Sequence, residues 1–236
     1  FWVNRIINFM VDKEKNRINE VYNNYLLNKE NSEKWSSQNY GNFLIENEKL
    51  ESIQKVLAPL GLLNKTESIL DIGCANGNTI SLIKKIGFLE SIICGVDLRE
   101  NRLNDAKILY PSSNFKCMDA RYLSFPNNSF DIVSIFTVFS SIIRKIDRIK
   151  VATQIDRVLK PKGIVIFYDL RYGNPFNYNV IGIKYSEVDE LFPKYKKSIK
   201  PVTLLPPFSR MIGRQSKFLY TWFSKISFLR THYLGI

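Results

Sequence analysis

The sequence predicts an α/β fold in which a mostly parallel sheet carries helices on both faces. Short apolar runs alternate with helix-like runs over residues 65–170, as expected for parallel strands joined by crossover helices. Before them, Arg17–Leu27 and Phe43–Leu60 have apolar positions at three- and four-residue steps, which predicts two helices around a loop at Trp35–Gly41. With 45% hydrophobic residues, a chain of 236 residues can bury the core of one domain.

The segment 68–77, Ser-Ile-Leu-Asp-Ile-Gly-Cys-Ala-Asn-Gly, predicts a buried strand, a tight turn and a helix start. Gly73 closes the strand, and Gly77 precedes the helix-like run Asn78–Ile86. This arrangement suits a nucleotide-like ligand, because a Cβ at either glycine would obstruct the approach of the backbone to it. The G-x-G-x-x-G dinucleotide fingerprint does not fit, since it needs a glycine where Ala75 stands.

Two further predicted strands each deliver a carboxylate at their ends. The run Ser91–Val96 leads to Asp97, about twenty residues beyond the glycine turn, where an acid can accept hydrogen bonds from both ribose hydroxyls. The run Asn114–Met118 leads to Asp119 and Ala120. The carboxyl ends of neighbouring parallel strands meet at one edge, so these acids should lie near the glycine turn.

The fourth and fifth predicted strands follow a helix end and a turn. Phe130–Phe136 is an apolar run broken only by one acid and one serine, and Ile164–Tyr168 is continuous. Between them, Arg157–Gly163 reads as the end of a helix, which we expect Pro161 to stop while Gly163 supplies the turn into the sheet.

These features, in this order, resemble the class I S-adenosylmethionine-dependent methyltransferases. The first motif of that family reads acidic-x-Gly-x-Gly-x-Gly; Asp71, Gly73 and Gly77 match it, while Ala75 replaces the middle glycine. The Phe-Asp-apolar-apolar start of residues 130–136 and the Pro-x-Gly turn match as well. The resemblance implies a Rossmann-like seven-stranded, mostly parallel sheet with helices on both faces and an antiparallel last strand.

The resemblance also implies the cofactor and the residues that hold it. In the family, the acid after the second strand binds ribose, and the acid after the third strand reads the adenine amino group. The expected S-adenosylmethionine-binding residues are Asp71, Gly73, Cys74, Ala75, Gly77, Asp97, Leu98, Asp119, Ala120 and Phe136. No metal site is expected.

We expect one domain with three parts: a helical lid at 1–64, the cofactor-binding core at 65–170 and a substrate-side region at 171–236. Three tyrosines of the lid, Tyr22, Tyr25 and Tyr40, either cover the cofactor or pack in the core. The predicted elements of the last region are a helix at Ser186–Phe192, a strand at Ser198–Leu205, a basic-aromatic helix from about Ser209 to Phe228 and a strand at Thr231–Ile236.

Three further segments, 136–142, 168–175 and 229–235, resemble a bacterial subgroup associated with surface-polysaccharide biosynthesis. The expected function is therefore methyl transfer from S-adenosylmethionine to a small-molecule or glycan acceptor, on oxygen. The alternatives are a quinone- or lipid-type acceptor, an RNA acceptor, and a domain that binds S-adenosylmethionine without turnover.

The candidate catalytic residues are His232, Asp169 and Arg171. A sugar hydroxyl loses its proton when it is methylated, and His232, the only histidine, is a candidate base. Asp169 and Arg171 follow the fifth strand, where Asp169 can orient a hydroxyl and Arg171 can hold a phosphate or carboxylate. The structural alternatives are packing or capping for His232 and a mutual ion pair for the other two.

Charge is concentrated towards the C-terminus. The chain carries a net charge of +12, and residues 184–236 hold ten Lys or Arg against three acids, none of them after Glu190. The aromatic residues interleaved with this charge are Phe208, Phe218, Tyr220, Trp222, Phe223 and Phe228. The pattern suits an anionic membrane surface or a lipid-linked acceptor, an RNA backbone, or packing on the sheet. Nothing resembles a separate RNA-binding module, so nucleic acid is not the expected partner.

The remaining sequence features predict a cytoplasmic protein, with peripheral contact at the inner face of the membrane. Cys74, Cys94 and Cys117 are expected to be small buried hydrophobes on inner strands, neither a disulfide framework nor a metal set. No apolar run approaches the roughly twenty residues that span a bilayer. Asn4 and Arg5 interrupt the first apolar residues, so no cleavable signal is expected.

Overall fold

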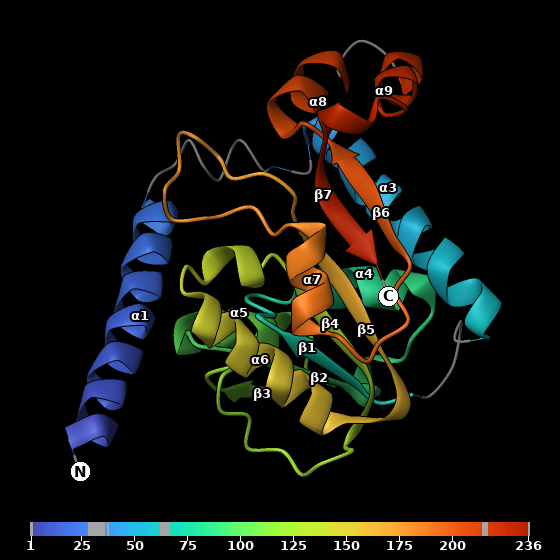
Figure 1. Cartoon of the computed structure of the whole chain (residues 1–236). Coiled ribbons are helices and arrows are strands. Elements are labelled where there is room, and N and C mark those ends of the chain that lie inside the picture. The colour runs from blue at the N-terminus through green and yellow to red at the C-terminus, as the bar shows by residue number, and fades with distance from the viewer. Residues whose placement is uncertain (1, 28–35, 37, 62–66, 214–216, 236) are drawn as a thin grey trace.

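The chain forms a seven-stranded sheet with helices on both faces (Figure 1). The computed structural model describes residues 2–27, 36, 38–61, 67–213 and 217–235. The strands are β1 (Ile69–Ile72), β2 (Ile93–Asp97), β3 (Asn114–Cys117), β4 (Phe130–Phe136), β5 (Leu159–Leu170), β6 (Ile199–Leu204) and β7 (Arg230–Gly235). Their order across the sheet is β3-β2-β1-β4-β5-β7-β6.

Strand pairing confirms the predicted fold class. The pairs β1–β2, β2–β3, β1–β4 and β4–β5 are parallel, whereas β7 runs antiparallel to both β5 and β6. The carboxyl ends of β1, β2, β4 and β5 therefore meet at one edge, where open α/β sheets bind ligands.

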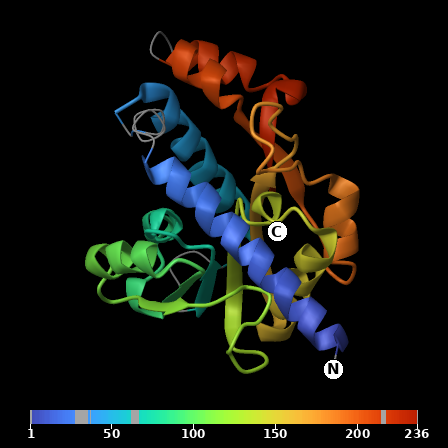
Figure 2. The ribbon, with the colours of Figure 1, turned by 90° about the vertical axis from the view of Figure 1, so that its left-hand side faces the viewer.

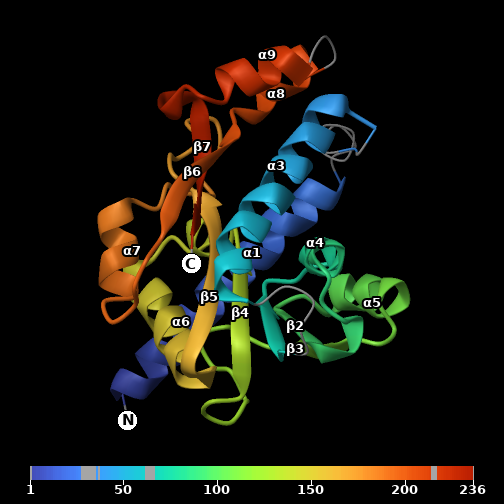
Figure 3. The ribbon, with the colours of Figure 1, turned by 90° about the vertical axis from the view of Figure 1, so that its right-hand side faces the viewer.

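The helices divide between the two faces. They are α1 (Trp2–Leu27), α3 (Tyr40–Leu57), α4 (Asn78–Ile86), α5 (Glu100–Leu109), α6 (Lys145–Val158), α7 (Tyr185–Leu191), α8 (Pro206–Gly213) and α9 (Lys217–Phe223). The short 3₁₀ turns are η1 (Ala58–Leu60), η2 (Glu90–Ile92), η3 (Phe139–Ser141) and η4 (Ser227–Leu229). One buried cluster joins α3, α4 and α5 to the sheet and another joins α6 and α7 to its opposite face, as Figure 3 shows.

Both predicted N-terminal helices are present, and both start earlier than expected. The first covers Trp2–Leu27, and α3 begins at Tyr40, where the Asn39 side chain accepts a hydrogen bond from the Gly41 amide at 2.9 Å. Such an Asn cap satisfies a backbone donor that the helix itself leaves unpaired. Most of the predicted loop, including Trp35, lies outside the described residues.

The turn that we predicted before the fifth strand lies inside β5, where the pairing with β4 is irregular. Lys162, the residue before Gly163, has a φ of 66° and adopts the left-handed conformation. Gly163 is needed for a different reason, because an added Cβ would lie 2.9 Å from the Asp131 carbonyl oxygen on β4. The glycine thus permits close contact between the two strands. Helix α6 ends before Pro161, as proline requires.

The predicted single helix from Ser209 to Phe228 was wrong. Two short helices, α8 and α9, occupy this segment, followed by η4, and residues 214–216 between them lie outside the described part. Their inner side packs on α3 and the end of β6 through the buried Leu44, Leu204, Ile212 and Tyr220.

A half-buried polar cluster anchors the two short helices to the sheet. The Glu48 carboxylate on α3 accepts hydrogen bonds from the Tyr220 hydroxyl at 2.8 Å and the Thr203 amide at 3.1 Å. The same carboxylate pairs with the Arg230 guanidinium at 2.6 Å. One side chain thereby joins α3, β6, β7 and α9. Within the described residues, no helix combines the length and apolarity that a membrane span requires.

Candidate functional site

The turn after β1 is held by the end of β2. The amides of Gly73 and Cys74 donate to the Val96 carbonyl at 2.8 and 3.1 Å. The next amide, that of Ala75, donates to the Asp97 carboxylate at 3.0 Å. Three successive backbone donors are thus satisfied by one neighbouring strand, so the path of the turn is set by the β1–β2 pairing.

Three residues of this turn have left-handed backbone conformations. The φ angles are 73° at Gly73, 47° at Ala75 and 88° at Gly77. A residue with a Cβ pays roughly 1–2 kcal/mol for this conformation, so Ala75 occupies a position that favours glycine. Added Cβ atoms at Gly73 and Gly77 would lie 2.4 Å from the side chains of Val138 and Tyr110, respectively. Both glycines are therefore required by packing within the protein, in addition to any ligand.

Asp71 is fully buried beneath this turn. Its Oδ1 accepts a hydrogen bond from the Ser134 hydroxyl at 2.7 Å, while its Oδ2 is buried without a hydrogen-bond partner among the described residues. The pKa of this carboxyl is raised to about 7, chiefly by burial; the Ser134 hydrogen bond lowers it, and the Asp97 charge contributes to the rise. The site thus contains a carboxyl group that ionises near neutral pH.

Asp97 is engaged on both of its oxygens at the end of β2. One oxygen accepts from the Ala75 amide, and the other accepts from the Arg99 amide at 3.0 Å. The Arg99 guanidinium also lies 3.4 Å from the carboxylate and 4.2 Å from the centre of the Tyr22 ring. Because a carboxylate has about four acceptor positions, these contacts leave capacity for ribose hydroxyls.

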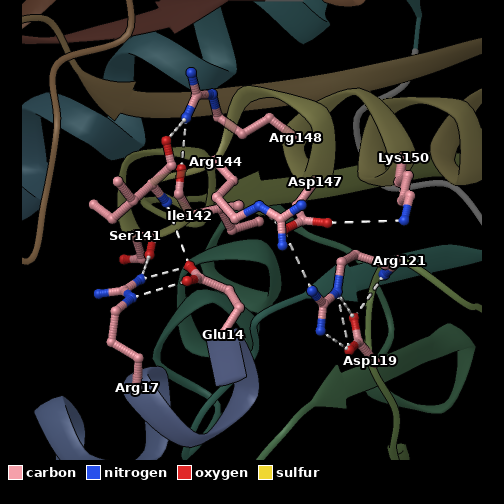
Figure 4. A network of polar contacts seen from close by, with 11 residues as sticks. Glu14, Arg17, Asp119, Arg121, Ser141, Ile142, Arg144, Asp147, Arg148 and Lys150 are labelled. Carbon is pink, nitrogen blue, oxygen red and sulfur yellow. Dashed lines mark hydrogen bonds and ion pairs between the residues drawn. The ribbon is translucent and has the colours of Figure 1, made fainter. Parts of the chain in front are cut away.

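Asp119 follows β3 and is paired with an arginine that the sequence analysis missed. Arg121 binds both carboxylate oxygens, with Nε–Oδ1 and Nη2–Oδ2 distances of 3.0 and 2.6 Å. Figure 4 shows this pair and the next contact, where Arg121 lies 3.5 Å from Asp147 on α6. The sequence signal that could have identified this pair is the position of Arg121, two residues after Asp119.

The other predicted cofactor residues also lie at the carboxyl edge. Cys74 is buried in the turn, and burial raises the pKa of its thiol far above its ordinary range, so it is inert. Leu98 and Ala120 are half-buried just beyond β2 and β3, and the Phe136 ring packs on Tyr168 with centroids 5.4 Å apart. Each predicted residue therefore lies at the end of a strand, or shortly after it, at this edge.

Cys117 was predicted to be buried and is exposed, whereas Cys74 and Cys94 are buried. The reason is topological. Strand β3 lies at the outer edge of the sheet, so a residue at its end has neighbours on one side only. All three thiols are free.

Helix α1 runs across this edge, as Figure 2 shows. The Tyr22 hydroxyl is 3.1 Å from the Ser141 hydroxyl, and Arg17 donates to the Ser141 carbonyl at 2.6 Å. The Tyr25 hydroxyl accepts a hydrogen bond from the side-chain amide of Asn177 at 2.6 Å. Helix α1 therefore contacts segments that follow β2, β4 and β5. Of the two roles considered for Tyr40, packing in the core was wrong, because this residue is exposed at the start of α3.

A network of charged residues extends from α1 to α6 (Figure 4). Glu14 pairs with Arg17 at 2.7 Å and accepts from the Ile143 amide at 3.4 Å. Arg144 lies 3.6 Å from the buried carboxylate of Asp147. These residues could not be found from local sequence, since Arg17 and Ser141 are 124 positions apart.

His232 is buried in β7 on the same face of the sheet as Phe136. Its ring stacks on Tyr168 at 4.6 Å, and its Nδ1 is 2.9 Å from the Thr231 hydroxyl. Burial, assisted by the charge of Lys49, lowers the pKa of His232 to about 3. The imidazole is therefore neutral at physiological pH.

Asp169 lies on the opposite face from His232, because Asp169 pairs with Tyr233 and Leu170 with His232. Its carboxylate accepts from the amides of Ser140 at 3.2 Å and Leu170 at 2.8 Å, and burial raises its pKa to about 6. The structure therefore separates two of the three candidate catalytic residues.

Arg171 is used within the C-terminal region. Its guanidinium donates to the carbonyls of Ser227 at 2.8 Å and Arg230 at 3.1 Å and packs over two tyrosine rings. The ion pair between Arg171 and Asp169 that we considered is absent from the described contacts. Arg171 instead joins the end of β5 to the start of β7.

A family comparison identifies the class to which this core belongs. The family model described as a methyltransferase domain matches residues 70–167, which extend from β1 into β5. Among curated proteins, none matches the sequence significantly.

Solved structures share the fold at low sequence identity. PH0226 from Pyrococcus horikoshii OT3 is 20% identical, with a TM-score of 0.53 over 78% of this chain and 88% of that one. An S-adenosylmethionine-dependent methyltransferase from Mesorhizobium loti is 15% identical, with a TM-score of 0.53 over 79% and 98%. The [4+2]-cyclase SpnF is 16% identical, with a TM-score of 0.55 over 78% and 79%. At these identities, the likeness shows the fold.

The family match places a methyltransferase domain at residues 70–167, and S-adenosylmethionine is the cofactor of this domain. The residues at the carboxyl edge fit this cofactor. Its sulfonium and ammonium groups are both positive, and the buried Asp71 Oδ2 is an unpartnered acceptor among the described residues. Asp97 is the candidate ribose ligand, and the turn from Gly73 to Gly77 supplies the close backbone approach.

Replacing Asp97 with alanine should weaken S-adenosylmethionine binding by about 1.5–3 kcal/mol, the range for hydrogen bonds to a charged group. The variant loses both the ribose acceptor and the contact that holds the Ala75 amide. Calorimetric titration of the folded protein measures this change. Asp105→Ala, which removes an exposed carboxylate from α5, is the control and should bind normally. Unchanged affinity in folded Asp97→Ala would contradict the ribose assignment.

Asp71→Asn should change how stability depends on pH. In the folded protein Asp71 keeps its proton up to about pH 7, whereas in the unfolded chain it loses it near 3.8. Since the folded state binds the extra proton, its stability falls as pH rises through this window, by up to about 4 kcal/mol. Asp71→Asn has no titrating carboxyl group at this position, so its stability does not fall for this reason as pH rises.

Urea unfolding of both proteins between pH 5 and 8, without cofactor, tests the role of Asp71. The free energy of unfolding of the variant should rise relative to the wild type with increasing pH and then become parallel to it. A difference that is constant across the range would show that Asp71 is ionised throughout.

Proposed function

We propose that this protein transfers the methyl group of S-adenosylmethionine to an oxygen atom of a small-molecule or glycan acceptor. The cofactor supplies a methyl group already activated by the sulfonium, so the protein mainly has to align an acceptor with it. The observation that carries the oxygen assignment is the environment of His232, which favours a neutral imidazole on the face of the sheet that also carries Phe136.

The hydrogen bonds of Thr231 favour one tautomer of His232. The Thr231 hydroxyl donates to the Thr203 carbonyl at 3.3 Å, so its oxygen is left to accept from the imidazole Nδ1–H at 2.9 Å. In this tautomer Nε2 carries a lone pair, as a base for a hydroxyl proton requires. The lowered pKa makes His232 a weak base, so alignment carries most of the proposed catalysis.

The glycan assignment is supported by the three segments that resemble the polysaccharide-associated subgroup. Two of them, 136–142 and 168–175, follow β4 or end β5 at the carboxyl edge, and 229–235 contains β7. The [4+2]-cyclase among the similar structures carries this fold with a different named reaction. The acceptor therefore has to be tested directly.

Incubation with S-adenosylmethionine labelled on its methyl group tests the acceptor class. A nucleotide-sugar and glycan fraction should become labelled, whereas total RNA should not. Binding of a pocket-sized acceptor should also depend weakly on salt, while an RNA backbone would be released steeply as salt rises. Efficient labelling of a defined nucleotide would overturn the preference for a glycan acceptor over an RNA acceptor. Labelling of only a lipid extract would favour the quinone- or lipid-type alternative.

His232→Gln tests whether this residue takes the hydroxyl proton. The substitution should lower kcat by roughly 10²-fold with cofactor affinity intact, the low end of the 10²–10⁴-fold range for a positioned acid–base group, because the lowered pKa makes His232 a weak base. Because the His232 pKa is lowered to about 3, the wild-type rate should show no histidine inflection between pH 6 and 7.

Tyr168→Phe is the matched control for His232→Gln. It keeps the ring that stacks on His232 and removes a buried hydroxyl contact with Thr203, so it should affect stability and spare kcat. If His232→Gln lowers thermal stability with only a modest loss of kcat, the histidine is structural. Asp169→Asn would then test the remaining candidate base.

A further inference from the structure

The end of the molecule formed by α8 and α9 exposes several large apolar side chains. Helices α8 and α9, η4 and the start of α3 come together there (Figures 1 and 3). Phe218, Trp222 and Phe228 are 74%, 52% and 73% exposed, and Met211 is also exposed. We call these four side chains the apolar tip. An exposed apolar group of this size on a folded protein marks an interaction surface.

Packing of the helices does not bury the apolar tip. The inner side of α8 and α9 already has its own core, made by Ile212 and Tyr220 against α3 and β6. The half-buried Phe208 and Phe223 pack edge to face with centroids 4.8 Å apart. The alternative in which the aromatic residues pack inward therefore accounts for Phe208 and Phe223. Trp222 also packs edge to face on Phe223, with centroids 4.8 Å apart, and still leaves about half of its surface exposed.

The charge around the tip is positive. Residues 206–230 contain five Lys or Arg and no acid, and Lys217 and Lys225 are exposed. The carboxylate that faces this segment from α3 is Glu48, and it is already bound to Arg230, Tyr220 and Thr203. The outer surface therefore combines exposed rings with two exposed lysines, and neither lysine has an ion pair among the residues that the structure describes.

A second exposed aromatic group lies on the same side. Phe176 and Tyr178, in the loop between β5 and α7, are 94% and 90% exposed. Figure 1 shows this loop extending from the body of the molecule towards the end that carries α8 and α9. Residues 171–186 contain no acid. The loop is held to α1 through the hydrogen bond between Asn177 and Tyr25.

We propose that the apolar tip docks on an anionic lipid bilayer, with its rings at headgroup depth and its lysines on the lipid phosphates. Aromatic residues concentrate at membrane interfaces, and each cation near an anionic surface adds to the attraction. RNA is the weaker occupant, because a backbone-tracking surface needs a continuous row of cations, whereas the tip has more exposed apolar side chains than exposed lysines.

Docking in this way would bring the carboxyl edge close to the membrane. Strand β7 starts at the tip, and Arg171 joins that start to the end of β5. A lipid-linked acceptor would then reach the site without leaving the bilayer. This last consequence rests on the proposed function, whereas docking itself does not.

Co-sedimentation of the full chain with vesicles tests the docking. Vesicles of phosphatidylcholine mixed with phosphatidylglycerol should bind the protein, vesicles of phosphatidylcholine alone should bind it weakly, and salt should release it. Phe218→Ser with Trp222→Ser, and separately Lys217→Glu with Lys225→Glu, should each weaken binding at least about tenfold. Affinity for S-adenosylmethionine, measured by calorimetry, should stay unchanged in both variants.

The matched control is Lys194→Glu with Lys196→Glu, which reverses two exposed lysines before β6, at the other end of that strand from α8. It should bind vesicles like the wild type. Docking is overturned if the tip variants and this control bind vesicles equally. It is also overturned if the tip variants lose only retention on RNA, or only a dimer seen at high protein concentration. None of these outcomes depends on methyl transfer.

Discussion

The cofactor site depends on the way the end of β2 binds the turn after β1. Three consecutive amides, from Gly73 to Ala75, donate to Val96 and Asp97. This contact requires the two strands to be parallel and adjacent, since only then do their carboxyl ends coincide. It also brings the Asp97 carboxylate next to the turn and near Asp71, whose pKa it helps to raise. Sheet topology and site electrostatics therefore have a common origin.

The parts of the fold that were predictable from sequence are those set by local pattern. The helix Asn78–Ile86 and the strand Phe130–Phe136 have the predicted bounds, because a glycine or a polar turn delimits each apolar run. The carboxylates Asp97 and Asp119 were also found, since each directly follows a strand. Their partners were harder to predict. Arg99 and Arg121 are close in sequence to these acids, but spacing alone does not distinguish an ion pair from a ligand contact.

Other features depend on contacts between distant segments, which a sequence pattern does not contain. The residues Tyr168, Asp169 and Leu170 alternate between the faces of β5, so a one-residue difference decides whether a side chain lies with His232 or opposite it. The inner packing of α8 and α9 likewise depends on distant residues, Leu44 on α3 and Leu204 on β6. The basic-aromatic composition of this segment was visible in the sequence, while the division into buried and exposed rings was not.

The buried Asp71 connects fold stability to ligand binding. Its Oδ2 has no hydrogen-bond partner among the described residues, and burial makes ionisation of the carboxyl group unfavourable. A cationic ligand bound nearby would favour the ionised carboxylate, and by linkage the same interaction would strengthen binding. Ser134 supplies the single hydrogen bond from a side chain that lowers the pKa, so the carboxyl group remains close to its titration point at neutral pH. In the protein without cofactor, the Asp71 carboxyl group is therefore only partly hydrogen-bonded, and a cationic ligand that pairs with it gains binding free energy from this interaction.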